Sequence, residues 1–419
     1  MALNRWIGGA AAVAQVQTET VADTWANAQP DTLTATINNK DVVFTVGATE
    51  TVSAVVAGMV AAWNASTVPE HAEITAVDAD PDIVFTADIA GIPFILTLVA
   101  DTAGDGDVSS VATTAATGPN HADSAANWSL GAVPVNTNEV IIEDSSVPIL
   151  YGFDQSGVAL ASCDIKQSYT GTIGLPTQNA NGYAEYREQY LKIDPGVLTI
   201  GEGGGTGSGR IKIDHGAEPQ VITVLGSGAR AEPGIPSILL KGSDGANTLA
   251  INRGDVGVAI FGGESAEYAS LAIGYTTSQP TDARVITGGS VTLPVVDKSG
   301  GTLDLGAASL TTVTQSAGEM TLRSTSDIVN TLKLDGGICY DMGGVNTVGT
   351  LTIAEAAEYN HDKSHAARTI TNITMVKGAI FTDTFGVTTQ TYGFDLSLTK
   401  LEDVVIHLPP NKTWTPSAI

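Results

Sequence analysis

Three short stretches share one pattern and decide the fold: Val329-Asn-Thr-Leu332-Lys-Leu334, Val348-Gly-Thr-Leu351-Thr-Ile353 and Ile370-Thr-Asn-Ile373-Thr-Met375. Together with a similar stretch around Val313, they recur about every 20 residues. Within each stretch apolar residues alternate with polar ones, as in a strand with one buried face. A repeat of this length predicts a parallel β-helix, in which each turn of chain stacks on the next.

The composition agrees with a thin, layered β-structure. Hydrophobic residues make up 43% of the 419, but aromatic residues are only 5% and charged residues 15%. The 46 glycines suit the tight corners between short strands, and pairs such as Gly300-Gly301 and Gly336-Gly337 are the expected corners. Few large aromatics and many β-branched residues favour sheets over a thick helical core.

A different pattern comes before the repeats. Residues 32–37 and 41–46 alternate around Asn38-Asn39, which predicts a hairpin. Residues 51–64 carry apolar side chains at three- and four-residue spacing, which predicts a helix capped near Thr49 or Thr51. A small α+β domain fits this order.

The expected fold class is therefore mainly β, with a small N-terminal α+β domain followed by a right-handed parallel β-helix; the handedness follows the general habit of parallel crossovers. The segments are expected to be an N-terminal arm (1–30), a small α+β anchoring domain (31–117), a junction or cap (118–138), the parallel β-helix (139–408) and a C-terminal tail (409–419).

The N-terminal segment is expected to be a mature arm. Arg5 and the Ala/Gly/Val stretch after it loosely resemble a secretory signal, but glycines interrupt the apolar part. Trp6 and Trp25 are candidate anchors for a partner. No run of 18 or more apolar residues occurs, so no membrane contact is expected.

Charge and cysteine content limit the possible functions. The net charge of −26 disfavours nucleic acid as a partner, because its phosphates would be repelled. Cys163 and Cys339 lie far apart in strand-like stretches, so we expect buried free thiols.

No catalytic, cofactor or metal site is expected. Asp101, Asp105 and Asp107 form an acidic turn that would suit calcium, but it lacks the EF-hand glutamate, and a solvated loop is the favoured interpretation. Glycan-cleaving β-helices use paired carboxylates. The candidate acids here are not distinguished from ordinary turn residues: Glu185, Glu188, Asp194, Asp214 and Glu264.

An insertion at residues 176–190 is the best candidate for partner binding. It carries Tyr183, Tyr186, Arg187 and Tyr190, and tyrosine with arginine makes effective contact surfaces. The alternative interpretation is a loop packed on its own solenoid or on a neighbouring subunit.

Four stretches carry a resemblance to a known class of proteins. They are the N-terminal residues 2–16, Ala126-Asn127-Trp128-Ser129, Ile149-Leu150-Tyr151-Gly152, and Gln167-Ser168-Tyr169-Thr170-Gly171-Thr172-Ile173-Gly174-Leu175-Pro176. With them the chain resembles, over most of its length, uncharacterised proteins of tailed bacteriophages and prophages.

This resemblance implies a structural virion protein on the virion surface, of the capsid decoration or head fibre type. The N-terminal part would anchor it, and the β-helix would project from the particle. The expected partners are other virion proteins of the capsid or tail, further copies in a homotrimer, and a possible host surface glycan. The alternative is a receptor-binding tail fibre or tailspike, possibly glycan-cleaving.

Overall fold

The structure is a computed structural model. It describes residues 2–22, 25–26, 31–47, 49–101, 106–216, 218–274, 283–307, 309–323, 328–342, 347–361, 369–384, 391–394 and 404–408. The expected C-terminal tail, 409–419, lies outside these residues.

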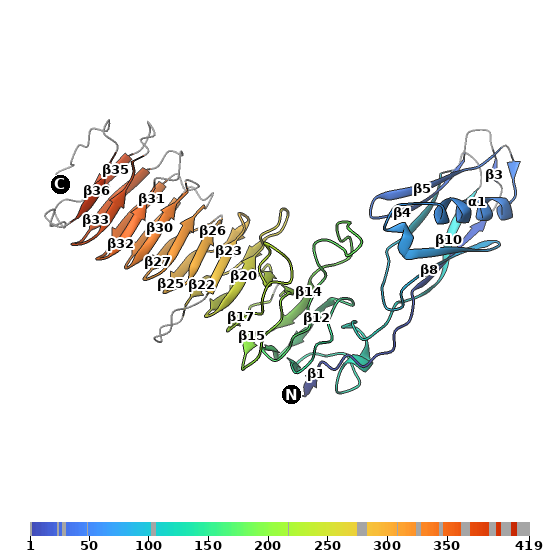
Figure 1. Cartoon of the computed structure of the whole chain (residues 1–419), viewed down its shortest axis with the longest axis horizontal. Helices are drawn as coiled ribbons and strands as arrows, with labels where there is room; N and C mark the ends of the chain where they lie inside the picture. The colour runs from blue at the N-terminus through green and yellow to red at the C-terminus, as the bar shows by residue number, and fades with distance from the viewer. Residues whose placement is uncertain are drawn as a thin grey trace.

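Two long parallel sheets dominate the molecule (Figure 1). The first has 13 strands, in spatial order β1 (Leu3–Arg5), β11 (Glu139–Ile142), β13 (Ser162–Lys166), β15 (Val197–Glu202), β17 (Val221–Val224), β19 (Thr248–Ile251), β22 (Ser270–Ile273), β25 (Val295–Lys298), β27 (Thr312–Gln315), β29 (Ile328–Leu334), β31 (Thr347–Ile353), β33 (Thr369–Met375) and β35 (Thr391–Phe394). The second has 12 strands, in order β12 (Asp154–Leu160), β14 (Leu191–Pro195), β16 (Ile211–Asp214), β18 (Ile238–Lys241), β20 (Gly254–Val258), β23 (Ala283–Thr287), β26 (Thr302–Leu305), β28 (Glu319–Leu322), β30 (Gly337–Asp341), β32 (Ala357–Asn360), β34 (Ile380–Thr382) and β36 (Val405–His407).

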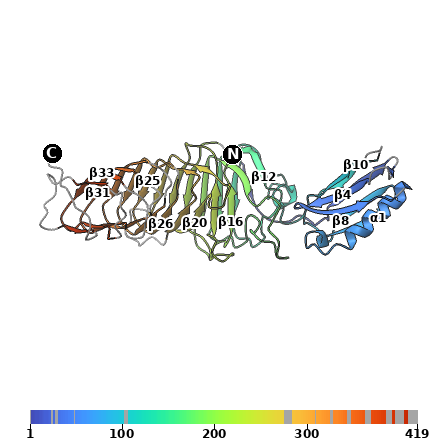
Figure 2. The same ribbon diagram turned by 90° about the horizontal axis from the view of Figure 1, so that it is seen from above.

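The chain alternates between these sheets, so that each coil gives one strand to each sheet. This makes a β-solenoid, seen from above in Figure 2, and the prediction of a mainly β fold with long parallel sheets is confirmed. A two-stranded sheet of β21 (Ala266–Glu267) and β24 (Val291–Thr292) flanks the coils.

The register follows the repeat seen in the sequence. Val313 pairs with Leu332, Leu332 with Leu351 and Leu351 with Ile373, each on the next strand of the 13-stranded sheet. All four side chains are fully buried. Because strand side chains alternate between faces, this register places the apolar residues of every coil inside the solenoid.

Glycines stack at one corner of the coils. Gly301, Gly318 and Gly337 have φ of 63°, 77° and 75°, a region that other residues rarely adopt. A Cβ on Gly318 would fall against the carbonyl oxygen of Gly301, and one on Gly337 against that of Gly318. The predicted corners at Gly300-Gly301 and Gly336-Gly337 are therefore places where the chain backbones nearly touch.

Both cysteines are buried free thiols, as predicted. Cys163 on β13 pairs in register with Leu198. Burial raises the pKa of its thiol to about 12, so the group behaves as a small apolar side chain.

The first residues belong to the solenoid, although an arm over 1–30 was expected. Strand β1 pairs in parallel with β11, and Trp6 lies edge-on against Trp128 with ring centroids 5.3 Å apart. Trp6 donates to the carbonyl of Val147, and Trp128 to that of Ala122. Trp128 follows the short helix η2 (Ala125–Asn127). The two rings cover the apolar end of the first coil.

The small domain is inserted between β1 and the rest of the solenoid. The chain leaves along residues 7–15 and returns along 115–120, and the two segments meet at an antiparallel bridge between Val13 and Thr117. Figure 1 shows the domain displaced from the rod at this end. The insertion explains why the N-terminal segment divides between two units.

Two antiparallel sheets and one helix build the small domain. The sheets are β10 (Asp107–Thr114), β2 (Val16–Ala22), β8 (Asp82–Ala87), β7 (Ile74–Ala79), and β5 (Lys40–Thr45), β4 (Thr32–Ile37), β9 (Thr97–Asp101), with a short pair β3 (Trp25–Ala26) and β6 (Thr49–Glu50). Helix α1 (Val52–Asn64) begins at Thr51, whose side chain accepts from the Ala54 amide, and buries Met59 and Trp63. The predicted hairpin and helix are confirmed.

One buried histidine in the solenoid is held neutral. His215 is fully buried, its Nε2 lies 2.7 Å from the Tyr268 hydroxyl, and a Cβ on Gly242 would collide with its ring. Burial lowers the pKa of His215 from 6.5 to about 4. As the pH falls, His215 is therefore protonated in the unfolded chain before it is protonated in the folded one.

Replacing Gly318 by Ala should lower the free energy of unfolding by about 2 kcal/mol or more, because the residue has positive φ and meets backbone. Gly262→Ala is the matched control, since a Cβ there meets nothing within 4 Å, and it should change stability by less than about 0.5 kcal/mol. Chemical denaturation measures both. Equal losses would contradict the stacked corner.

The contribution of His215 to stability is complete above about pH 6.5 and is lost as the pH falls towards 4. Across that window the free energy of unfolding of the wild type should fall by up to about 3 kcal/mol more than that of His215→Gln. Denaturation at a series of pH values measures this difference. Parallel pH profiles for the two proteins would show that His215 is not held neutral.

Candidate functional site

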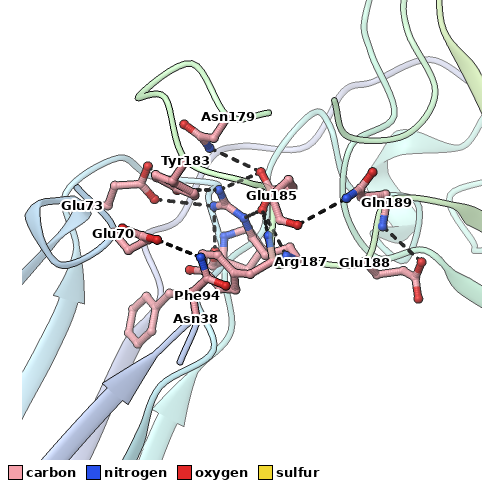
Figure 3. A network of polar contacts seen from close by, with 12 residues as sticks. Asn38, Glu70, Glu73, Phe94, Asn179, Tyr183, Glu185, Arg187, Glu188 and Gln189 are labelled. Atoms are coloured by element: carbon pink, nitrogen blue, oxygen red, sulfur yellow. Dashed lines mark hydrogen bonds and ion pairs between the residues drawn. The ribbon is translucent and has the colours of Figure 1, made fainter. Parts of the chain in front are cut away.

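A polar network joins the small domain to the solenoid and is drawn in Figure 3. Residues 176–190, the loop between β13 and β14 singled out in the sequence, reach across to the small domain. There they meet Glu73, at the end of the short helix η1 (His71–Glu73), and the carbonyl of Pro93 before β9. We call this network the interdomain latch; its members are Glu73, Pro93, Asn181, Tyr183, Glu185 and Arg187.

Arg187 is the centre of the latch. Its Nε and Nη2 donate to the two carboxylate oxygens of Glu185, at 2.7 and 3.1 Å, which is a bidentate pair. Nη1 donates to the Pro93 carbonyl at 3.2 Å and lies 3.8 Å from Glu73 Oε2. Nη2 also donates to the Tyr183 hydroxyl. One guanidinium thus contacts both units of the chain.

Glu73 makes the remaining contacts from the small domain. Its Oε1 accepts from the Tyr183 hydroxyl at 2.6 Å and from Asn181 Nδ2 at 2.8 Å. Asn179 supports the other side by donating to Glu185 Oε2. Glu73 and Glu185 each therefore accept hydrogen bonds from more than one side chain of the 176–190 loop.

The centre of the latch is buried, which makes its charges depend on one another. Arg187 and Glu185 are 5% and 8% exposed. Burial alone would raise the pKa of Glu185, but the hydrogen bonds and charge of Arg187 outweigh it and hold the pKa below its usual value. Burial raises the pKa of Tyr183, and its hydrogen bond to Glu73 raises it further. The pair is ionised and the phenol is neutral.

Apolar contact accompanies the polar one. Tyr186 is half-buried against the core of the small domain, and the Arg187 guanidinium lies 5.1 Å from the centre of its ring. Burial raises the pKa of Tyr186 to about 12. The residues predicted to bind a partner, Tyr183, Tyr186 and Arg187, thus contact the small domain of their own chain.

The other predicted partner residues also lie inside the molecule. Trp6 is 2% exposed in the end of the solenoid, and Trp25 is fully buried in the small domain, where it donates to the Ala22 carbonyl. Tyr190 is 4% exposed beneath the ammonium of Lys241, which lies 4.1 Å from its ring centre. The structure does not bring these three together with one another.

The candidate acids all have partners within the chain. Glu185 pairs with Arg187, Glu188 with Lys192 at 2.8 Å, and Asp214 with Lys241 at 3.7 Å. Asp194 accepts from Gln220, and Glu264 from the amide of Phe261. Burial raises the pKa of Asp194. Each of the five acids thus has a polar or charged partner within the chain.

In the acidic turn, Asp101 ends β9 and Asp107 begins β10, while Asp105 lies outside the described residues. Across the ranges that the structure describes, no group of three or more His, Cys, Asp or Glu side chains is placed to hold a metal. In those same ranges, no helix has the length and apolar character needed to cross a membrane.

Sequence reasoning found one side of the latch and missed the other. The 176–190 loop stood out through its tyrosines and Arg187. Glu73 and the Pro93 carbonyl gave no signal, because their role depends on where the inserted domain lies in space.

Comparison with known proteins gave no match: no family model fits the chain, and no curated protein or solved structure is similar to it.

Arg187→Met should lower the free energy of unfolding by about 3 to 5 kcal/mol, because it leaves Glu185 buried without its partner. The control is Arg323→Met. That arginine pairs with Asp304 on the surface and is 56% exposed. Its loss should cost less than about 1 kcal/mol.

Denaturant titration gives both values. Small-angle scattering of Arg187→Met should also show a wider spread of distances between the small domain and the rod. A stability loss no larger than that of the control would contradict the central role of Arg187.

Proposed function

We propose that this chain is a structural virion protein of a tailed bacteriophage, anchored by its N-terminal part, with the β-solenoid extending from the particle as a decoration or head fibre. The single observation that carries the proposal is the arrangement of the two units. A rod of stacked coils carries, at one end, an inserted domain that a buried latch holds in place. The sequence resemblance to phage proteins is the reason for proposing a virion as the particle to which the chain attaches.

The rod suits a mechanical role. Its strands pair continuously along two sheets, and most of its buried side chains are apolar and form one continuous cluster. Separating any two coils would break a ladder of hydrogen bonds together with the apolar contacts beneath it. Such a structure resists unfolding and proteolysis, which an exposed particle component needs. The finer features we infer with it are right-handed coils, as parallel crossovers favour, and a place on the virion surface.

The small domain offers a surface for attachment. On the sheet β5-β4-β9, Val43 and Val99 both pair in register with Thr34 and point away from the core. They are 51% and 56% exposed and flank Thr34, so two exposed valines lie on the same face of this sheet. Exposed apolar patches of this kind mark protein contacts, and we assign this one to another virion protein.

A second function, receptor binding with possible glycan cleavage, is favoured by one observation. An open groove of about 620 Å³ runs beside the 176–190 loop, with Tyr186, Tyr190 and Phe261 next to Glu188 and Glu264. Aromatic rings beside carboxylates suit a sugar ligand. Incubation with host polysaccharide separates the two functions: new reducing ends would indicate cleavage, and their absence together with binding would indicate a receptor-binding fibre.

The proposal is tested by electron microscopy of particles with the protein labelled at its C-terminal end. We expect labels at a distance from the particle surface, with the small domain against it. Val43→Glu combined with Val99→Glu should reduce attachment at least about tenfold, because it buries two carboxylates at the contact.

Thr75→Glu combined with Val77→Glu is the matched control. These residues are exposed on β7, in the other sheet of the same domain, and this variant should remain attached. Attachment of both variants, or absence of the label from particles, would overturn the proposal.

A further inference from the structure

The outer face of the 13-stranded sheet carries almost no charge. From β17 to β35, the outward side chains that the structure describes are mostly Thr, with Val, Ala, Ser and Asn, and Asp297 and Lys333 are the charged ones among them. One column of register partners runs Val295, Thr312, Thr331. The face is therefore a flat, weakly polar strip along the rod.

The opposite sheet is different. Its outward side chains on β23, β26, β28 and β32 include Arg284, Asp304, Glu319 and Glu358. The whole chain carries a charge of −26. Two copies approaching through charged surfaces would repel one another, whereas the neutral strip allows them to meet. Parallel sheets also usually have both faces covered.

The strip has an apolar anchor and sufficient size. Val221, on β17, is 53% exposed. Nine strands at about 4.8 Å spacing and about four residues wide give roughly 500 Å² of flat surface per copy. A pair of copies would cover about 1,000 Å², the lower limit for a specific interface.

The two charges on the strip complement each other across a two-fold axis. Asp297 pairs in register with Thr314, and Thr314 with Lys333, so the charges lie at equal distances on either side of Thr314. Lys333 is 48% exposed and also contacts Asp335 at the end of its strand. If two strips face each other with their rods antiparallel and Thr314 on the axis, each Asp297 lies opposite the other copy's Lys333. Parallel rods would place like charges at the same height.

We propose that two copies of this chain pack face to face through this strip, with their rods antiparallel. The inference goes beyond the proposed function and does not depend on attachment to a particle. In the pair the two small domains lie at opposite ends, so the pair is proposed for the protein in solution, and a single rod that projects from a particle would first be released from it. An interface of this kind buries a weakly polar surface and pairs the charges that it contains.

Light scattering of the full chain after gel filtration tests the proposal, and it should give twice the mass of one chain. Thr314→Arg places a charge on the axis and should weaken association about tenfold or more. Thr321→Arg is the matched control, because Thr321 is a half-buried outward threonine on β28 in the other sheet, and it should leave the pair intact. A monomer in the wild type, or equal weakening by both variants, would overturn the proposal.

A charge exchange tests the antiparallel arrangement. Asp297→Lys and Lys333→Asp should each weaken association about tenfold, because each places like charges opposite one another. The two changes together should restore it. Failure of the double variant to restore association, or a mass three times that of one chain, would contradict the antiparallel pair and favour a different symmetry.

Discussion

The stacking of one coil on the next, in a fixed register, is the constraint on which this structure depends. Val313, Leu332, Leu351 and Ile373 form one such column inside the solenoid. A shift of one residue would turn every apolar side chain of a strand outward, so apolar burial fixes the register. The glycine corner allows neighbouring backbones to approach closely enough for the column to close. Side chains on the outer faces then follow equally fixed columns.

The inserted domain depends on the solenoid in a different way. It enters and leaves through the two segments that meet at Val13 and Thr117. The latch adds a contact between the two units by burying the Arg187–Glu185 pair against Glu73. Buried charge pairs contribute little net stability, but they fix geometry, since each partner is costly to leave alone. A rigid junction is what the proposed anchored rod would require.

The solenoid was predictable because its signal is local and repeated. The period of the Thr-Leu stretches, the glycine pairs and the helix from Val52 can all be read from neighbouring residues. The insertion was not, because the pairing of β1 with β11 joins residues more than 130 positions apart. For the same reason Trp6 and Trp25 were predicted as surface anchors, whereas burial places them in two separate cores. Only one side of the latch could be predicted from the sequence, because only the 176–190 loop carries an aromatic signature.

Disulfide formation between neighbouring coils tests the register most directly. Thr302 and Glu319 are exposed register partners on β26 and β28, and Ile338 lies one further strand away on β30. Cysteines replacing Thr302 and Glu319 should form an intramolecular disulfide on mild oxidation, because adjacent strands lie about 4.8 Å apart. Cysteines replacing Thr302 and Ile338 should not. Crosslinking of the second pair, or failure of the first, would contradict the stacked, in-register solenoid.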